Sequence, residues 1–186
     1  MRVKTQAAKQ NIATKRVVLA GNPNAGKTTL FNALTKSNLR TGNFHGVTTA
    51  PSEKTVGDIT YVDAPGLYAL SAYSMEEVSA ADEIKSAHLI IDVADALTLE
   101  NSLNLTKRLQ DTGKPVILYI TKLSQLRRRG GSLDAEKLSL ILGVPVFTCP
   151  PKQLKKEIEG GVKFNIKRQS APLSSAYSAG CEGLSR

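Results

Sequence analysis

The sequence predicts an α/β domain, in which a mostly parallel sheet of six strands carries helices on both faces. Short apolar runs suited to buried strands alternate with stretches whose apolar residues recur at helical spacing. Aromatic residues make up only 5% of the 186-residue chain and Trp is absent, so the core must rest on aliphatic side chains. Parallel sheets are built from such residues. A ligand is then expected at the carboxyl ends of the strands.

The order of the elements follows from the apolar pattern and from glycine and proline positions. Strands are predicted at 16–20, 53–56, 58–62, 89–93, 116–120 and 144–148. A first helix is predicted to follow the loop that ends at 28 and to run to about 36. Further helices are predicted at 75–86, from 99 to the stop at Gly113, at 134–142 and at 152–159. A mobile loop is expected at 37–49 and a basic loop between 121 and 133.

Domain boundaries follow from composition. Residues 1–15 are predicted to be a flexible N-terminal arm and residues 16–160 the folded domain. The chain after Gly160 is small, polar and basic, so 161–186 are predicted to be a linker or a disordered tail.

The segment from Gly21 to Thr28, GNPNAGKT, fits the phosphate-loop pattern G-x-x-x-x-G-K-[ST] and lies between a predicted strand and a predicted helix. Its glycines allow the backbone to approach phosphate oxygens, and the positive end of the helix dipole faces the same anion. Lys27 is expected to bind the β- and γ-phosphates and Thr28 to bind Mg²⁺. The alternative is a glycine turn that happens to precede a Lys-Thr pair. The nucleotide-binding residues predicted here are Asn22, Asn24, Ala25, Gly26, Lys27, Thr28 and Thr29.

A second phosphate-side element, Asp63-x-x-Gly66, follows the predicted strand 58–62. The carboxylate can hold Mg²⁺ directly or through water, and the Gly66 N–H can reach the γ-phosphate. The segment Gly46-Val47-Thr48 lies between the two motifs. Thr48 is expected to give Mg²⁺ a further oxygen when this loop closes over a triphosphate.

Composition argues against several other classes of function. No apolar run reaches the ~18–20 residues of a membrane span, and no secretory signal is expected at the N-terminus. The net charge of +9 invites an anionic partner, but much of it lies in the two ends and in Arg127–Arg129, so no nucleic-acid partner is expected. Cys149 and Cys181 are expected to be free thiols. Neither His45 nor His88 has a ligand at metal-binding spacing, so no iron site is expected.

Six segments follow one another along the chain: GNPNAGKTTLFNALT (21–35), GNFHGVT (42–48), DAPGLYALSAYSMEE (63–77), DALTLENSLNLT (95–106), KRLQDTGKPVIL (107–118) and RRGGSLDAEKLSLILGVPV (128–146). In order and spacing they resemble the cytoplasmic G domain of FeoB-type ferrous iron transporters. The resemblance covers roughly residues 15–155 and is more specific than the phosphate loop alone.

This resemblance implies a Ras-like P-loop GTPase fold that binds GTP and GDP and slowly hydrolyses GTP with Mg²⁺. It also implies a regulatory role in Fe²⁺ transport, a membrane-embedded remainder of the transporter as partner, and a place on the cytoplasmic side of the bacterial inner membrane. A homo-oligomer is left open. The catalytic residues carried over are Asn24, Lys27, Thr48 and Gly66, and the Mg²⁺ ligands are Thr28, Thr48 and Asp63. Asn24 matches the asparagine that helps hold K⁺ in potassium-activated members, and Leu67 stands where many GTPases have a water-orienting Gln.

The chain departs from the family in three places. The guanine-reading motif is Thr121-Lys122-Leu123-Ser124, with a hydroxyl where a carboxylate is expected. The next base-side loop, Thr148–Lys152, contains Cys149 followed by two prolines, which have no N–H to offer a guanine carbonyl. The helical domain expected near 165 is replaced by the predicted tail. Thr121, Lys122, Ser124 and Cys149 are the predicted base-side residues. A nucleotide-binding interaction module with little turnover is the main alternative, and an RNA-associated GTPase is a third.

Overall fold

The computed structural model describes residues 15–39, 51–66, 75–163 and 175–179. Six strands form the main sheet in the order β2-β3-β1-β4-β5-β7. They are β1 (Lys15–Ala20), β2 (Ser52–Val56), β3 (Ile59–Asp63), β4 (Leu89–Asp95), β5 (Val116–Thr121) and β7 (Val146–Phe147). Only β2 runs antiparallel to its neighbour, and Gly57, with φ of 59°, lies in the turn that joins it to β3. The predicted mostly parallel six-stranded sheet is confirmed.

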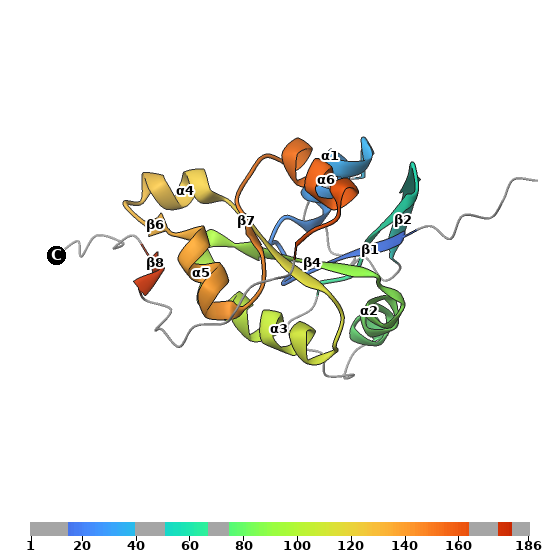
Figure 1. Ribbon diagram of the computed structural model, residues 1–186, viewed down its shortest axis with the longest axis horizontal. Coiled ribbons are helices and arrows are strands. Elements are labelled where there is room, and N and C mark those ends of the chain that lie inside the picture. The colour runs from blue at the N-terminus through green and yellow to red at the C-terminus, as the bar shows by residue number, and fades with distance from the viewer. Residues whose placement is uncertain (1–14, 40–50, 67–74, 164–174, 180–186) are drawn as a thin grey trace, which may run out of the picture.

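Helices cover both faces of this sheet, as Figure 1 shows. They are α1 (Lys27–Thr35), α2 (Met75–Ser86), α3 (Leu99–Asp111), α4 (Leu123–Arg128), α5 (Ala135–Leu142) and α6 (Pro151–Gly160), with the 3₁₀ turn η1 (Ala96–Thr98) before α3. Apolar residues of α1 and α6 pack on one face, together with Leu19, Ile91 and Ile117 of the strands. Apolar residues of α2, α3, α4 and α5 pack on the other face, against the alternate strand residues. The period-two alternation of the strands thus supplies two aliphatic cores.

The helix ends agree with the local sequence signals. The Asp134 side chain accepts a hydrogen bond from Lys137 N at 2.9 Å and caps α5, and Gly143, with φ of 72°, ends that helix. Pro151 occupies the first turn of α6, where a missing N–H costs no helical hydrogen bond. None of the helices within the described residues is long and apolar enough to cross a membrane.

The structure differs from the prediction in the stretch expected to be a basic loop. It forms the short helix α4 and the strand β6 (Ser132–Leu133). Leu126 anchors α4 because its side chain is only 2% exposed in the core, while the neighbouring arginines face outward. One buried leucine among charged residues is too short a pattern to predict a helix from the sequence.

A second difference lies in the predicted linker or disordered tail. Within it, residues 175–179 are ordered and form the strand β8 (Tyr177–Ser178), which pairs antiparallel with β6. Ala176 is buried in the same core cluster as Leu126 of α4 and Leu138 of α5. Because the burial comes from contacts distant in sequence, the polar composition of the segment could not reveal it.

Candidate functional site

The phosphate loop follows β1, and unusual backbone dihedrals shape it. Gly21 has φ of 143°, and a Cβ at this position would lie 2.3 Å from the Val93 carbonyl oxygen. Gly26, with φ of 99°, precedes α1, and Asn24 also has a positive φ of 62°. No side chain of the described ranges caps the first turn of α1, and no acidic residue lies in that turn. The N–H groups at this helix end therefore remain available to an anion.

The Lys27 side chain points back to the loop that precedes α1. Its ammonium donates to the carbonyl oxygens of Gly21 and Asn22, at 2.9 Å each, and its side chain is 7% exposed. Burial lowers the pKa of Lys27 to about 8, against the opposing effect of the Asp63 and Asp92 carboxylates. Within the described residues, the hydrogen-bond partners of the cation are thus neutral carbonyls, and phosphate oxygens would be stronger partners.

Thr28 and Asp63 form the second part of the phosphate side. The Thr28 hydroxyl donates to Asp63 Oδ2 at 2.8 Å, and the buried Asp63 Oδ1 has no hydrogen-bond partner among the residues that the structure describes. Burial raises the pKa of Asp63, while the Thr28 hydroxyl and the Lys27 ammonium lower it. Adjacent hydroxyl and carboxylate oxygens fit a hard divalent cation such as Mg²⁺.

Gly66 lies close to the phosphate loop. A Cβ at Gly66 would come within 2.8 Å of Pro23 Cγ, so the two segments could not approach this closely with a larger residue. The motif after β3 and the loop after β1 are therefore neighbours. The predicted residues Gly46, Val47 and Thr48, together with His45 and Leu67, lie outside the described residues.

The base-side motif begins at the end of β5. The Thr121 hydroxyl donates to Ala25 O at 2.7 Å and interacts with Ala94 O at 3.1 Å. Lys122, in a left-handed conformation with φ of 56°, donates to Asn24 O at 3.0 Å and to Asp95 Oδ2 at 2.5 Å. Both side chains therefore tie the phosphate loop to the end of the sheet.

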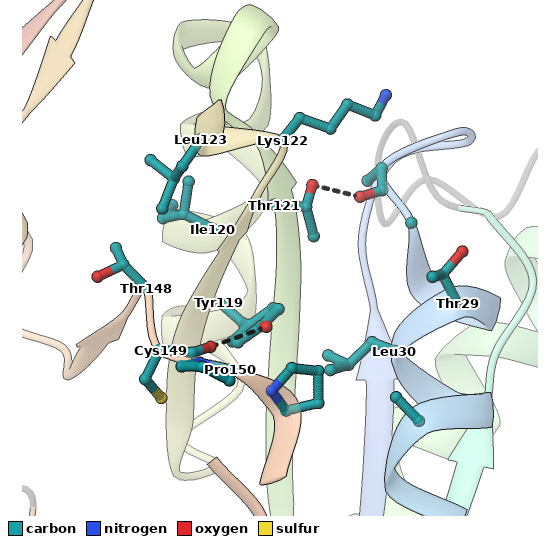
Figure 2. A pocket seen from close by; sticks show the side chains of 14 residues that line it. Thr29, Leu30, Tyr119, Ile120, Thr121, Lys122, Leu123, Thr148, Cys149 and Pro150 are labelled. Carbon is teal, nitrogen blue, oxygen red and sulfur yellow. Dashed lines mark hydrogen bonds between the residues drawn. The ribbon is translucent and has the colours of Figure 1, made fainter. Parts of the chain in front are cut away.

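A cavity of about 470 Å³ opens beside these residues. Figure 2 shows the Thr121 hydroxyl directed at the phosphate loop and the Tyr119 hydroxyl directed at the Cys149 carbonyl, 3.0 Å away. The wall is largely apolar, since it includes Leu30, Leu123 and Pro150. The other lining residues are Ala25, Gly26, Thr29, Ala33, Ile120, Lys122, Thr148 and Pro151. The cavity adjoins the phosphate loop and can hold a flat aromatic ring. Few side chains of its wall are placed to hydrogen-bond to the edge of such a ring.

The other residues singled out in the sequence lie in different surroundings. Cys149 lies in the cavity wall, and burial raises the pKa of its thiol. Ser124, in the first turn of α4, is exposed and is not among the residues that line the cavity. Asn24 is also exposed. The buried Oδ1 of Asn22 has no partner in the described part of the chain, and the Asn22 amide nitrogen approaches Ser102 Oγ at 3.4 Å. His88 accepts a hydrogen bond at Nδ1 from Arg16 N, 3.0 Å away.

Two aspartates near the phosphate loop were missed by the sequence reasoning. Asp95 ends β4 and binds Lys122. Asp92, fully buried in the same strand, accepts a hydrogen bond from the Thr106 hydroxyl at 2.6 Å. Burial raises the pKa of Asp92 to about 7, although Thr106 and Lys27 act in the opposite direction. The available signal was a pair of aspartates, three residues apart, in an otherwise apolar strand. Within the described residues, no three His, Cys, Asp or Glu side chains gather as a metal site.

Comparison with known families agrees with this geometry. The family model described as "Ferrous iron transport protein B", FeoB_N, matches residues 15–159. The chain belongs to this family. The match spans the phosphate loop, the motif after β3 and the base-side loops, so the resemblance noted from the sequence is confirmed.

Relatives and solved structures point to the same family. The Fe(2+) transporter FeoB of Legionella pneumophila (strain Lens) is 41% identical over 155 residues, covering 76% of this chain and 20% of the relative. That of Helicobacter pylori (strain J99) is 36% identical over 147 residues, covering 76% and 22%. The chain thus spans about a fifth of the length of these curated relatives.

The structure of NFeoB from S. thermophilus bound to GDP.AlF4- and K+ aligns with a TM-score of 0.72 at 37% identity. The alignment covers 79% of this chain and 60% of that one. The FeoB G-domain from Methanococcus jannaschii aligns with a TM-score of 0.66 at 33% identity, covering 78% of this chain and 96% of that domain. Together with the observed sheet order, these alignments confirm the Ras-like P-loop GTPase fold.

Proposed function

We propose that this chain is a Mg²⁺-dependent GTPase domain that binds GTP and GDP, hydrolyses GTP slowly and regulates ferrous iron transport. The observation that carries the proposal is the cluster of Lys27, Thr28 and Asp63, gathered at the carboxyl ends of β1 and β3 beside an uncapped helix N-terminus. Such a cluster suits phosphoryl transfer, in which positioning and charge stabilisation supply most of the catalysis.

Each phosphate-side residue has a distinct role in the proposed reaction. Lys27 binds β- and γ-phosphate oxygens, and the uncapped N–H groups at the start of α1 cradle the same oxygens. Thr28 and Asp63, together with Thr48, hold Mg²⁺ directly or through water. When bound, Mg²⁺ neutralises charge on the phosphates. The Gly66 N–H reaches the γ-phosphate.

A monovalent cation fits the same site as a further aid to hydrolysis. Leu67 provides no side-chain amide to orient water. The Asn24 side chain is exposed on the loop, where its carbonyl oxygen can bind K⁺ beside the phosphates. A family member at 37% identity is described as bound to GDP.AlF4- and K+, which supports this assignment.

The base side supports only weak selectivity for guanine. The Thr121 hydroxyl, the Lys122 ammonium and the Tyr119 hydroxyl are paired with protein oxygens, and Ser124 replaces the carboxylate that would accept from guanine N1 and N2. This observation also favours the second candidate function, a nucleotide-binding interaction module with little turnover. In either case we propose that the rest of the transporter in the membrane is the partner, because the relatives are named Fe(2+) transporters and are about five times longer.

Phosphate release separates the two candidates. A GTPase should release phosphate from GTP in a Mg²⁺-dependent manner, and Asp63→Ala should slow that release much more than it weakens binding of a fluorescent GDP. Asp58→Ala, at the exposed turn between β2 and β3, serves as the control for loss of one carboxylate. Tight binding with no release above the Asp63→Ala background would favour the interaction module.

A further inference from the structure

The chain beyond α6 returns to the folded domain at residues 175–179. Strand β8 pairs with β6, placing Ser178 opposite Ser132 and Tyr177 opposite Leu133. The Ala176 carbonyl accepts a hydrogen bond from Asp134 N at 2.9 Å, and Ala176 itself is 4% exposed. The segment is therefore held by backbone pairing on one side and by core packing beneath.

The side chain of Tyr177 reaches across to the η1 turn. Its hydroxyl donates to the Ala96 carbonyl at 2.9 Å, over 81 positions of sequence. Burial raises the pKa of Tyr177, and the Glu100 and Asp95 carboxylates act in the same direction. The phenol therefore stays protonated at neutral pH and remains a donor.

Asp95 connects the η1 turn to the base-side residue Lys122. Asp95, the residue before Ala96, caps the turn by accepting from Leu97 N at 2.8 Å through Oδ1. Its other oxygen accepts from Lys122 Nζ, which also donates to Asn24 O in the phosphate loop. A continuous series of contacts thus runs from the tail through Ala96, Asp95 and Lys122 to the nucleotide loop.

We propose that Tyr177 is a positioning residue of the nucleotide site, which fixes the η1 turn so that Asp95 holds Lys122 against the phosphate loop. The proposal rests on the proposed function, since it assumes that this loop binds nucleotide. Tyr177 is not among the residues that line the cavity. Through these contacts Tyr177 slows the dissociation of a bound nucleotide. The segment that follows the G domain thereby acts on the nucleotide site.

The alternative is that Tyr177 only stabilises the fold. In that case its removal would lower the thermal midpoint without changing nucleotide dissociation. In the proposed case its effect depends on Asp95, since the contacts act in series. Spatial continuity alone does not establish such coupling, so a double-mutant cycle is the appropriate measurement.

The experiment uses the full chain with Mg²⁺ and fluorescent mant-GDP, and measures its dissociation rate. Tyr177→Phe removes only the hydroxyl and should speed dissociation about threefold, the effect of one net hydrogen bond. Asp95→Asn retains an N-capping side chain but loses the charge opposite Lys122, and should speed dissociation about tenfold. The double variant should match Asp95→Asn alone. Ser178→Ala is the matched control in β8, because the Ser178 hydroxyl is paired with the Ser132 hydroxyl at 3.3 Å. Its rate should equal that of the original chain.

Two results would overturn the inference. One is an unchanged dissociation rate in Tyr177→Phe, whatever its thermal midpoint. The other is a double variant whose rate is the product of the two single effects. If the original chain itself fails to bind mant-GDP, the proposed function fails instead, so the two failures are distinct.

Discussion

The phosphate side and the base side of this site are built in different ways. On the phosphate side, Lys27 and Thr28 belong to one continuous segment, the loop after β1 and the first turn of α1, and Asp63 comes from the end of β3. On the base side, Thr121 and Lys122 contact Ala25, Asn24 and Asp95, and thus brace the loop instead of lining the cavity with free polar groups. The charged groups of the phosphate side are thus available to a ligand, whereas the polar groups of the base side hold the phosphate loop in place.

The difference shows which part of nucleotide recognition depends on side-chain identity. Phosphate binding relies largely on backbone N–H groups and loop dihedrals, which survive as long as the glycines and the lysine remain. Base reading relies on particular acceptors at the ring edge, and one substitution such as Ser124 for a carboxylate removes much of it. The two functions can therefore be lost separately.

The largest expected effect lies on the phosphate side. Lys27→Ala should weaken mant-GDP binding by about 100-fold or more, because it removes charge-assisted hydrogen bonds worth ~1.5–3 kcal/mol each. Fluorescence titration measures the affinity. Lys155→Ala is the matched control, since the Lys155 ammonium also donates to a backbone carbonyl, that of Leu34, but away from the loop. An unchanged affinity in Lys27→Ala would contradict the assignment of the phosphate loop.

On the base side, we expect selectivity for GTP over ATP or ITP of about tenfold or less, because a neutral hydroxyl replaces charged acceptors worth ~1.5–3 kcal/mol each. Ser124→Asp should raise the preference for GTP several-fold without restoring it fully. Competition of the three nucleotides against mant-GDP provides the ratios. Gln125→Asp adds the same charge at the adjacent exposed position of α4 and should leave them unchanged. A preference in the thousands in the original chain would show that guanine is read by other residues.

A smaller effect is expected from the monovalent cation. GTP hydrolysis should be several-fold faster in KCl than in NaCl at equal ionic strength, because K⁺ at Asn24 compensates for the missing water-orienting side chain. Asn24→Ala should remove the difference while mant-GDP binding is largely retained. Phosphate-release assays in the two salts measure it. Equal rates in the two salts for the original chain would argue against a K⁺ site.

The smallest expected effect is on the thermal stability of the chain and comes from the buried carboxyl group of Asp92. The pKa of Asp92 is about 7 in the folded chain and ordinarily about 3.9 when unfolded, so the folded state binds more protons between these values. Stability from this group therefore falls as the pH rises from about 4 to 7. Asp92→Asn can still accept from Thr106 and cannot ionise, so its thermal midpoint should exceed that of the original chain by a few degrees at pH 8 and by little at pH 5.

Circular dichroism melts at the two pH values test this expectation. Asp111→Asn, at the exposed end of α3, removes a carboxylate without changing a buried site and is the control. A difference in midpoint that is the same at pH 5 and pH 8 would contradict the buried ionisation of Asp92.

The sequence by itself determined the α/β class, the six-strand alternation and the phosphate loop, and also indicated the family. These features are readable because they are local: the loop between Gly21 and Thr28 sits between an apolar strand and an amphipathic helix, and its dihedrals depend on its own glycines. Most strands were predicted within one or two residues for the same reason, since apolar runs and turn residues mark their ends.

Only the tertiary structure decided how Asp92, Asp95 and Tyr177 are used. Asp95 and Lys122 are 27 positions apart, and Tyr177 and Ala96 are 81 apart, so no local pattern relates them. They meet because parallel strands bring their carboxyl ends to one edge of the sheet, and because burial of Ala176 holds the returning chain there. Burial also decides the ionisation of Asp92, since the cost of removing a carboxylate from water depends on what surrounds it in the folded chain.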